Sequence, residues 1–85
     1  MIPSSSAART PHRRELPAED LVETLTARQI ECLSWVQEGK TAWEIGRIMG
    51  ISARTVESYL AIAYGKLHVR TRVQAVVRAR NLGLI

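Results

Sequence analysis

The chain has 85 residues and a formal net charge of +4, and 46% of its residues are hydrophobic although none is Phe. This length allows one small domain at most, with an interior of aliphatic side chains. No apolar run approaches the roughly 20 residues of a membrane-spanning helix, the first residues lack the apolar core of a secretory signal, and the single Cys32 has no partner for an internal disulfide. We therefore expect an intracellular protein without membrane contact.

The charge is divided unevenly along the chain. Residues 1–45 carry five basic and seven acidic side chains, whereas residues 46–85 carry seven basic side chains and Glu57 as their only acid. A basic half suits a polyanion such as duplex nucleic acid. The alternative is an ordinary solvated surface.

The first 24 residues differ in composition from the rest. Residues 1–16 are rich in Ser, Ala, Pro and Arg and show no periodicity, which predicts a tail without a core. Residues 17–24 fit a helical turn or a lead-in to the fold. We therefore predict a flexible tail or linker over 1–24 and a folded domain over 25–85.

Four hydroxyl side chains mark four predicted helix starts. Thr26, Thr41 and Thr71 each precede a Gln or Glu by three residues, which is the spacing of a capping box, and Ser52 is placed as a fourth N-cap. No alternating strand pattern occurs. The predicted fold class is all-α, a four-helix bundle that contains a helix-turn-helix, with helices over residues 27–38, 42–49, 53–67 and 72–82.

The third predicted helix has two contrasting faces at 100° per residue. One stripe is apolar and consists of Val56, Leu60, Ala63 and Leu67. The opposite stripe is polar or small and consists of Arg54, Glu57, Ser58, Ala61 and Gly65. A shorter helix precedes it across a tight turn at Gly50 and Ile51. Two helices, a short turn with Gly and an exposed face on the second helix are typical of a helix-turn-helix.

With these features in view, residues 25–85 resemble the DNA-binding domain of the LuxR/GerE family of bacterial transcription regulators. The matching segments are Leu-Thr-Ala-Arg at 25–28, Gly-Lys-Thr-Ala-Trp-Glu-Ile at 39–45, Ile-Ser-Ala-Arg-Thr-Val-Glu at 51–57, Lys-Leu-His-Val at 66–69, Arg72 with Gln-Ala-Val at 74–76, and the final Gly-Leu-Ile. Trp35 and Trp43 around Gly39–Thr41 resemble the quorum-sensing subgroup that responds to acyl-homoserine lactones. Tyr59 departs from the His of many relatives, and residues 1–24 are too short for the sensory domain that most members carry.

The resemblance implies that the third helix lies in a major groove of DNA. Its outward side chains are then the candidates for reading base edges: Arg54, Glu57, Ser58 and Ala61. The candidates for phosphate contacts are Lys40, Thr41, Arg47, Ser52, Thr55, Tyr59 and Lys66. The alternative for Glu57 is a solvated charge near a helix N-terminus, and for the two caps a purely structural role.

The fourth predicted helix also divides into two sides. By the family pattern one side faces the core and consists of Ala75, Val76, Ala79 and Leu82. The other side consists of Val73, Val77 and Arg80, and in the family this helix supplies a dimer contact. The resemblance therefore implies a homodimer that reads two half-sites, with a scatter of exposed valines as the alternative.

The remaining residues suggest no chemistry. Cys32 is predicted to be a small core hydrophobe, and Trp35 and Trp43 are predicted to be packing groups. No nucleophile–base constellation, phosphate loop, paired carboxylates or metal-ligand spacing occurs. We therefore predict a protein that is not an enzyme and has neither a cofactor nor a metal.

The leading hypothesis is a sequence-specific, double-stranded-DNA-binding transcription regulator of quorum-sensing type. It would act as a dimer in the bacterial cytoplasm, at the nucleoid, with RNA polymerase as a further partner. The alternative is a stand-alone interaction module that heterodimerises with a full-length LuxR-type regulator and inhibits it. A third possibility is that the chain is a piece of a longer receptor with residues 1–24 as its linker.

Overall fold

The computed structural model describes residues 24–85, and the predicted tail lies outside the described residues except for Thr24. This part contains four helices, namely α1 (Ala27–Gln37), α2 (Ala42–Met49), α3 (Ala53–Leu67) and α4 (Arg72–Asn81). The all-α fold class is therefore confirmed. The predicted ends of the first and fourth helices, at residues 38 and 82, lie one residue beyond the observed ends.

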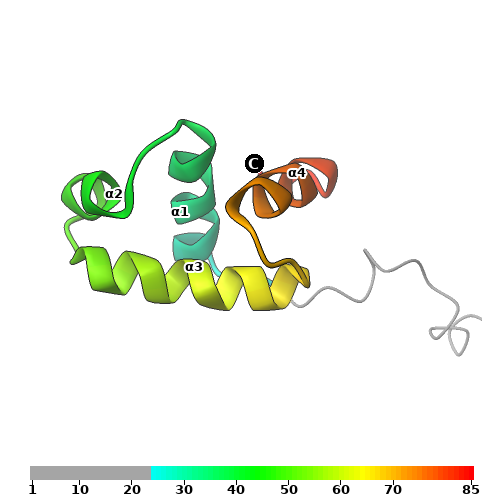
Figure 1. The fold of residues 1–85 in the computed structure, drawn as a ribbon, viewed down its shortest axis with the longest axis horizontal. Helices are drawn as coiled ribbons and strands as arrows, with labels where there is room; N and C mark the ends of the chain where they lie inside the picture. The colour runs from blue at the N-terminus through cyan, green and yellow to red at the C-terminus, as the bar shows by residue number, and fades with distance from the viewer. Residues whose placement is uncertain (1–23) are drawn as a thin grey trace, which may run out of the picture.

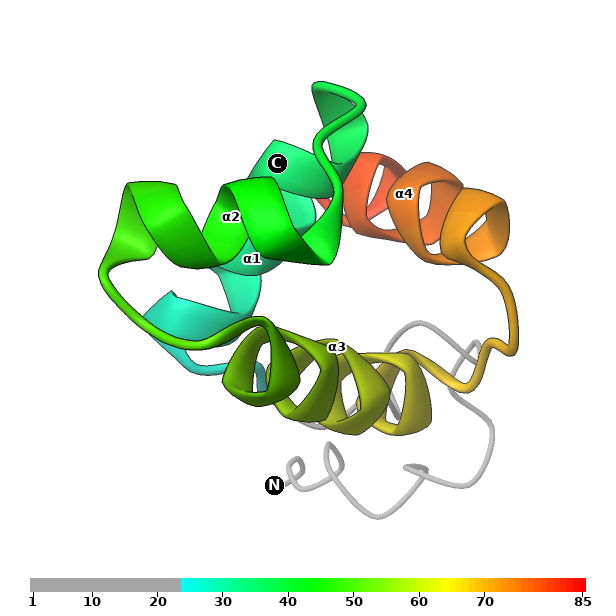
Figure 2. The same cartoon turned by 60° about the vertical axis from the view of Figure 1, so that its left-hand side comes forward.

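The longest helix, α3, lies across one side of the other three (Figure 1). It contacts α1, α2 and α4, and α1 also contacts α2 and α4. Figure 2 shows from a second direction that α2 and α4 lie on the same side of α3 as α1. Since α3 packs against all three neighbours from one side only, its opposite side is left uncovered by them.

The four predicted caps are present at the helix starts. Thr26, Thr41 and Thr71 each form a complete capping box with the third residue of the helix, and the Ser52 hydroxyl accepts the amide of Thr55 at 3.0 Å. Each such cap contributes roughly 0.5–2 kcal/mol. These local signals fix where the helices begin before any long-range packing is considered.

In α2 and α3 the C-cap residue itself has left-handed backbone, whereas in α1 and α4 the left-handed residue is the glycine after the C-cap. Gly50 has φ +74° at the end of α2, and the following Ile51 amide donates to the carbonyl of Gly46 at 2.9 Å. His68 has φ +60° at the end of α3 and is the one residue other than Gly with positive φ in the described range 24–85. The first of these ends makes the tight turn that carries the chain from α2 into α3.

One hydrophobic core joins all four helices. Its buried members are Leu25, Cys32, Leu33, Val36, Ile45, Val56, Leu60, Ala63, Leu67, Ala75 and Ala79. The whole predicted apolar stripe of α3 belongs to it, and so does Cys32, as predicted. Each fully buried large aliphatic side chain contributes about 1.5–3 kcal/mol to stability relative to exposure. The buried apolar stripe therefore holds α3 against the other helices.

Candidate nucleic-acid interface

The outward face of α3 carries the four side chains that the sequence predicts to read bases. Arg54, Glu57, Ser58 and Ala61 are all exposed, on the side opposite the buried stripe. Gly65 lies on the same side and is also exposed. The structure therefore brings these residues together as one surface, and their contacts with bases stay a prediction.

The position of α3 depends on a close approach between α2 and the turn that follows it. Gly46 is buried on α2, and a Cβ atom on it would lie 2.6 Å from the carbonyl oxygen of Ile51 and 3.2 Å from the amide nitrogen of Ala53. Only a residue without a side chain fits there without displacing the backbone. Gly46 is not among the site residues predicted from the sequence, although a helix-turn-helix packed this closely calls for a small residue where its helices meet.

The start of α3 is more open than the other three helix starts. Its third residue is Thr55, whose hydroxyl lies 2.9 Å from the Ser52 hydroxyl, and no acidic residue lies in the first turn. The other helices carry Gln or Glu at this position, which reaches back to the cap. The partial positive charge of the α3 N-terminus is therefore not opposed by a carboxylate in its own first turn.

The start of α2, by contrast, is occupied by an acid. The Thr41 amide donates to Glu44 Oε1 at 2.8 Å, and the Glu44 amide donates to Thr41 Oγ1 at 3.1 Å. The hydrogen bond from the Thr41 amide is the largest cause that holds the pKa of the Glu44 carboxyl below its usual range. Both the amide and the hydroxyl of Thr41 are thus engaged within the helix start, and its phosphate contact stays a prediction.

The predicted phosphate contacts at basic and aromatic side chains lie in different surroundings. Lys40 is half-buried, and its carbonyl accepts from the Arg72 guanidinium at 3.2 Å. Tyr59 is half-buried against the core. Lys66 is half-buried at the end of α3, where its ammonium group donates to the carbonyl of Thr24 at 3.0 Å and to Gln29 Oε1 at 3.2 Å. Two donors of Lys66 therefore already have acceptors within the domain.

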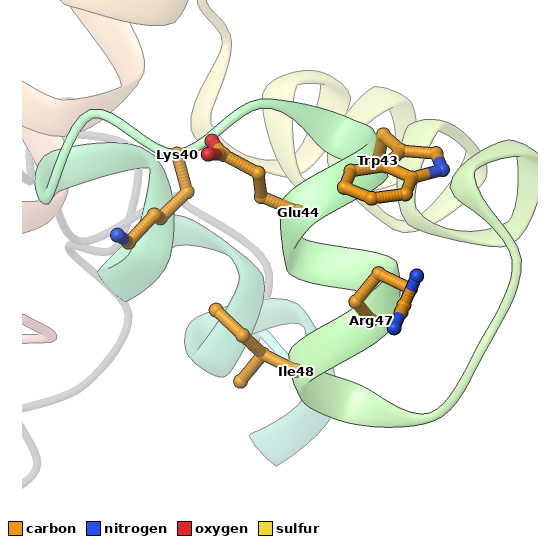
Figure 3. Close-up of a pocket in the computed structure, with 5 residues that line it drawn as sticks. All are labelled: Lys40, Trp43, Glu44, Arg47 and Ile48. Carbon is orange, nitrogen blue, oxygen red and sulfur yellow. The ribbon is translucent and has the colours of Figure 1, made fainter.

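A shallow groove of about 300 Å³ opens on the outer side of α2 (Figure 3). It is lined by Lys40, Trp43, Glu44, Arg47 and Ile48. Trp43 is 62% exposed and Ile48 46% exposed. The Arg47 guanidinium lies 5.1 Å from the centre of the Trp43 ring, a cation–π distance.

The two tryptophans were predicted to be packing groups, and only one of them is. Trp35 packs against the core, whereas Trp43 is mostly exposed. The prediction for Trp43 is wrong because α2 has only eight residues and packs against its neighbours through Ile45 and Gly46. Trp43 lies two residues before Ile45, about 200° away around the helix, and faces outward.

The two sides of α4 are as predicted. Ala75 and Ala79 are buried, and Val76 and Leu82 pack against the core. On the other side, Val73 and Val77 are 71% and 51% exposed, and Arg80 is exposed as well. A shallow groove of about 200 Å³ adjoins them and is lined by Val36, Gln37, Arg72, Val73, Val76 and Val77. The role of this surface in a dimer stays a prediction.

Three further properties of residues 24–85 concern metal binding, the single thiol and membrane insertion. No group of three or more His, Cys, Asp or Glu side chains in this range is arranged to hold a metal ion. Burial raises the pKa of the Cys32 thiol, and its sulfur lies 3.6 Å from the Met49 sulfur. Among the helices described here, none is both long and apolar enough to span a bilayer.

Comparison with known proteins identifies the domain. Residues 23–79 match the model of the family described as bacterial regulatory proteins, luxR family. "Transcriptional activator protein SolR" of Ralstonia nicotianae is 44% identical over 85 residues, which are 100% of this chain and 29% of that protein. "HTH-type quorum sensing-dependent transcriptional regulator RpaR" of Rhodopseudomonas palustris is 49% identical over 61 residues, 72% of this chain and 25% of that protein. "Transcriptional activator protein LuxR" of Aliivibrio fischeri is 44% identical over 61 residues, 72% and 24% of the two chains. The chain thus spans less than a third of the length of these relatives.

Proposed function

This chain belongs to the luxR family of bacterial regulatory proteins, and from that premise we propose that it recognises specific sequences in double-stranded DNA by placing α3 in the major groove. Its folded part is a LuxR-type DNA-binding domain, and the relatives are named as transcriptional activators and quorum-sensing-dependent regulators. We therefore propose transcription regulation of the quorum-sensing type, in the bacterial cytoplasm at the nucleoid, with no enzymatic step.

The observation that carries the proposal is the uncovered face of α3. All four apolar residues of its stripe are buried, whereas the exposed residues at the centre of the opposite side are polar or small. Ile62, which is 48% exposed, lies at the edge of that side, one turn after Ser58. A helix of 15 residues is about 22 Å long and about 10–12 Å wide with side chains. The major groove is about 12 Å wide and admits such a helix. No large apolar side chain lies at the centre of this face, where Ser58, Ala61 and Gly65 allow the helix to approach the base edges.

Each side chain on the face has a fitting partner in the groove. Arg54 offers paired donors to a guanine, Glu57 accepts from a cytosine amine, Ser58 bonds several edges, and Ala61 contacts a thymine methyl group. Ser52 and Thr55 at the open start of α3 suit a phosphate oxygen. Phosphate contacts fix the register of the helix, and the base contacts supply the sequence preference.

The exposed side of α4 supports a homodimer. Val73 and Val77 are large apolar groups that the described residues leave largely open to solvent, and a groove adjoins them. A two-fold interface there would be isologous, with each surface facing its own copy. Two copies of α3 would then read half-sites one helical turn, about 34–36 Å, apart.

The groove on α2 is the surface that best suits a protein partner other than a second copy. Its exposed Trp43 and Arg47 are of types enriched in interface cores, and the exposed Ile48 adds apolar surface beside them. Since relatives are named as transcriptional activators, we place the contact with RNA polymerase there. Trp43→Ala should then lower transcription from a bound promoter while the affinity for that promoter stays the same.

The test is selection of bound sequences from a random duplex pool, followed by titration of the selected DNA at several salt concentrations. We expect an enriched site with two-fold symmetry, and weaker binding to a scrambled duplex of the same composition. The affinity for both should fall linearly in log–log form with salt. An unenriched pool would refute the proposal, and salt-independent capture of a full-length LuxR-type regulator instead would favour the inhibitory interaction module.

A further inference from the structure

Lys66 joins three segments that lie far apart in the sequence. It lies in the last turn of α3, and its ammonium group donates to the carbonyl of Thr24, 42 positions earlier, and to the side chain of Gln29, 37 positions earlier. Thr24 precedes α1, and Gln29 lies in the first turn of that helix. One side chain therefore connects the end of the DNA-facing helix to the point where the chain enters the described domain.

The acceptor on α1 is itself held firmly. Gln29 is only 5% exposed, and its Oε1 also accepts the amide of Thr26 at 2.9 Å in the capping box. Lys66 thus completes a small network in which the oxygen of Gln29 serves both the helix start and the ammonium group. Hydrogen bonds from an ionised donor are shorter and stronger than those between neutral groups, so this network resists a shift of α3 relative to α1.

We propose that Lys66 is a positioning residue for DNA binding, which couples the backbone at Thr24 to the direction in which α3 presents its exposed face. The inference rests on the proposed function, because it concerns the same helix. The predicted phosphate contact of Lys66 is a different role, and the two differ in what they do to salt dependence. The plot of log K against log salt has a negative slope. Removing a phosphate contact makes this slope less steep by about 0.9, whereas removing a positioning contact leaves it unchanged.

The coupling has a consequence for regulation. The residues before Thr24 are bonded to its amide nitrogen, and its Cα joins that nitrogen to the carbonyl group that Lys66 holds. A displacement at Thr24 must either break this hydrogen bond or move the end of α3. The affinity for DNA is therefore sensitive to whatever pulls on the chain ahead of residue 24, and Lys66 is the side chain through which that sensitivity passes.

The experiment compares Lys66→Met, Lys66→Arg and the double variant Lys66→Met/Gln29→Met with the unmodified full chain, and uses Arg54→Met as the matched control for a direct DNA contact. Affinity for the selected duplex is measured at several salt concentrations, at a temperature where circular dichroism shows every variant folded. Amide chemical shifts of the free proteins supply a readout that does not depend on DNA.

We expect Lys66→Met to weaken binding roughly two- to thirtyfold, the range typical of substitutions that alter coupling between sites, with an unchanged salt slope. Arg54→Met should relax the preference at one base pair, whereas Lys66→Met should weaken binding to all duplexes alike. Lys66→Arg should retain the affinity. The double variant should bind little more weakly than Lys66→Met, since both changes break the Lys66–Gln29 contact; the Thr26–Gln29 hydrogen bond that Gln29→Met also removes lies at the start of α1. In the free protein, Lys66→Met should shift the amides of residues 24–29.

A salt slope that Lys66→Met makes less steep by about 0.9 would overturn the proposal in favour of a phosphate contact. Unchanged affinity would also overturn it. If the unmodified chain binds no duplex, the proposed function fails, whereas the shifts at residues 24–29 still report whether the contact exists; their absence would remove the basis of the inference itself.

Discussion

Two glycines in helices offer a matched test of how α2 and α3 are packed. Replacing Gly by Ala inside a helix stabilises it by about 1 kcal/mol through backbone propensity. Around Gly65 of α3, a new Cβ atom would meet nothing within 4 Å. Gly65→Ala should therefore raise the free energy of unfolding by up to about 1 kcal/mol.

The same change at Gly46 meets backbone atoms that cannot rotate away. The new Cβ would lie 2.6 Å from the Ile51 carbonyl oxygen and 3.2 Å from the Ala53 amide nitrogen. Overpacking of this kind costs about 1–3 kcal/mol, which cancels or exceeds the propensity gain. Gly46→Ala should therefore be between neutral and about 2 kcal/mol destabilising. Because Ile51 and Ala53 connect α2 to α3, relief of the contact should also move α3 and weaken DNA binding.

Urea denaturation followed by circular dichroism measures both effects. With a slope near 1 kcal/mol/M, the midpoints of Gly65→Ala and Gly46→Ala should differ by about 1–3 M, with the Gly46 variant the lower. The slopes themselves should agree, which would show that the denatured states are alike. Equal stabilisation by the two substitutions would refute the close packing of α2 against the turn.

Three further predictions concern charge and assembly. The pKa of Glu44 is lowered mainly by the Thr41 amide, so the stability it contributes should be present above its ordinary value of about 4.3 and lost as pH falls through the lowered value; Glu44→Gln should retain the capping box and flatten this acid limb in thermal melts between pH 3 and 7, and an unaltered limb would contradict the assignment. Arg54→Ala should relax the preference at one base pair, because the proposed partner of Arg54 is a guanine; equal weakening for all duplexes, with a salt slope less steep by about 1, would instead assign it to a phosphate. Val77→Asp should abolish cooperative binding to a two-fold site while a single half-site is bound as before. Ile48→Asp is the matched control, because the two side chains are 51% and 46% exposed, and equal effects of both would count against the α4 dimer.

The sequence predicted the helices accurately because their boundaries are encoded locally. Thr26, Thr41 and Thr71 form capping boxes with residues three positions later, and such spacing is visible without knowledge of the fold. The two faces of α3 are similarly a matter of counting at 3.6 residues per turn. Periodicity predicts the two faces of a helix correctly when one face is buried along the whole helix, and α3 meets that condition.

Long-range contacts could not be obtained in the same way. The acceptors of Lys66 lie 42 and 37 positions away. The sequence around Lys66 therefore predicts only a cation at the end of a helix. The exposure of Trp43 depends on how few neighbours a helix of eight residues has, and hydrophobicity alone favours burial. The role of Gly46 was also hidden in the sequence. A glycine inside a helix destabilises that helix, and the reason for it here is the Ile51 carbonyl that lies beside it in the folded structure.

The two sides of α3 differ in what they contribute: the buried side stabilises the fold, and the exposed side is the one proposed to bind DNA. Val56, Leu60 and their partners on the stripe are fully engaged in the core, so the exposed side makes little contribution to folding. Substitutions at surface positions of this kind usually change stability by less than about 0.5 kcal/mol. If Ser58 and Ala61 read bases as proposed, their exchange should therefore alter base preference without unfolding the domain. Lys66 is the exception, since it lies on the same helix yet bonds to α1 and to Thr24, and a change there alters where the reading face points.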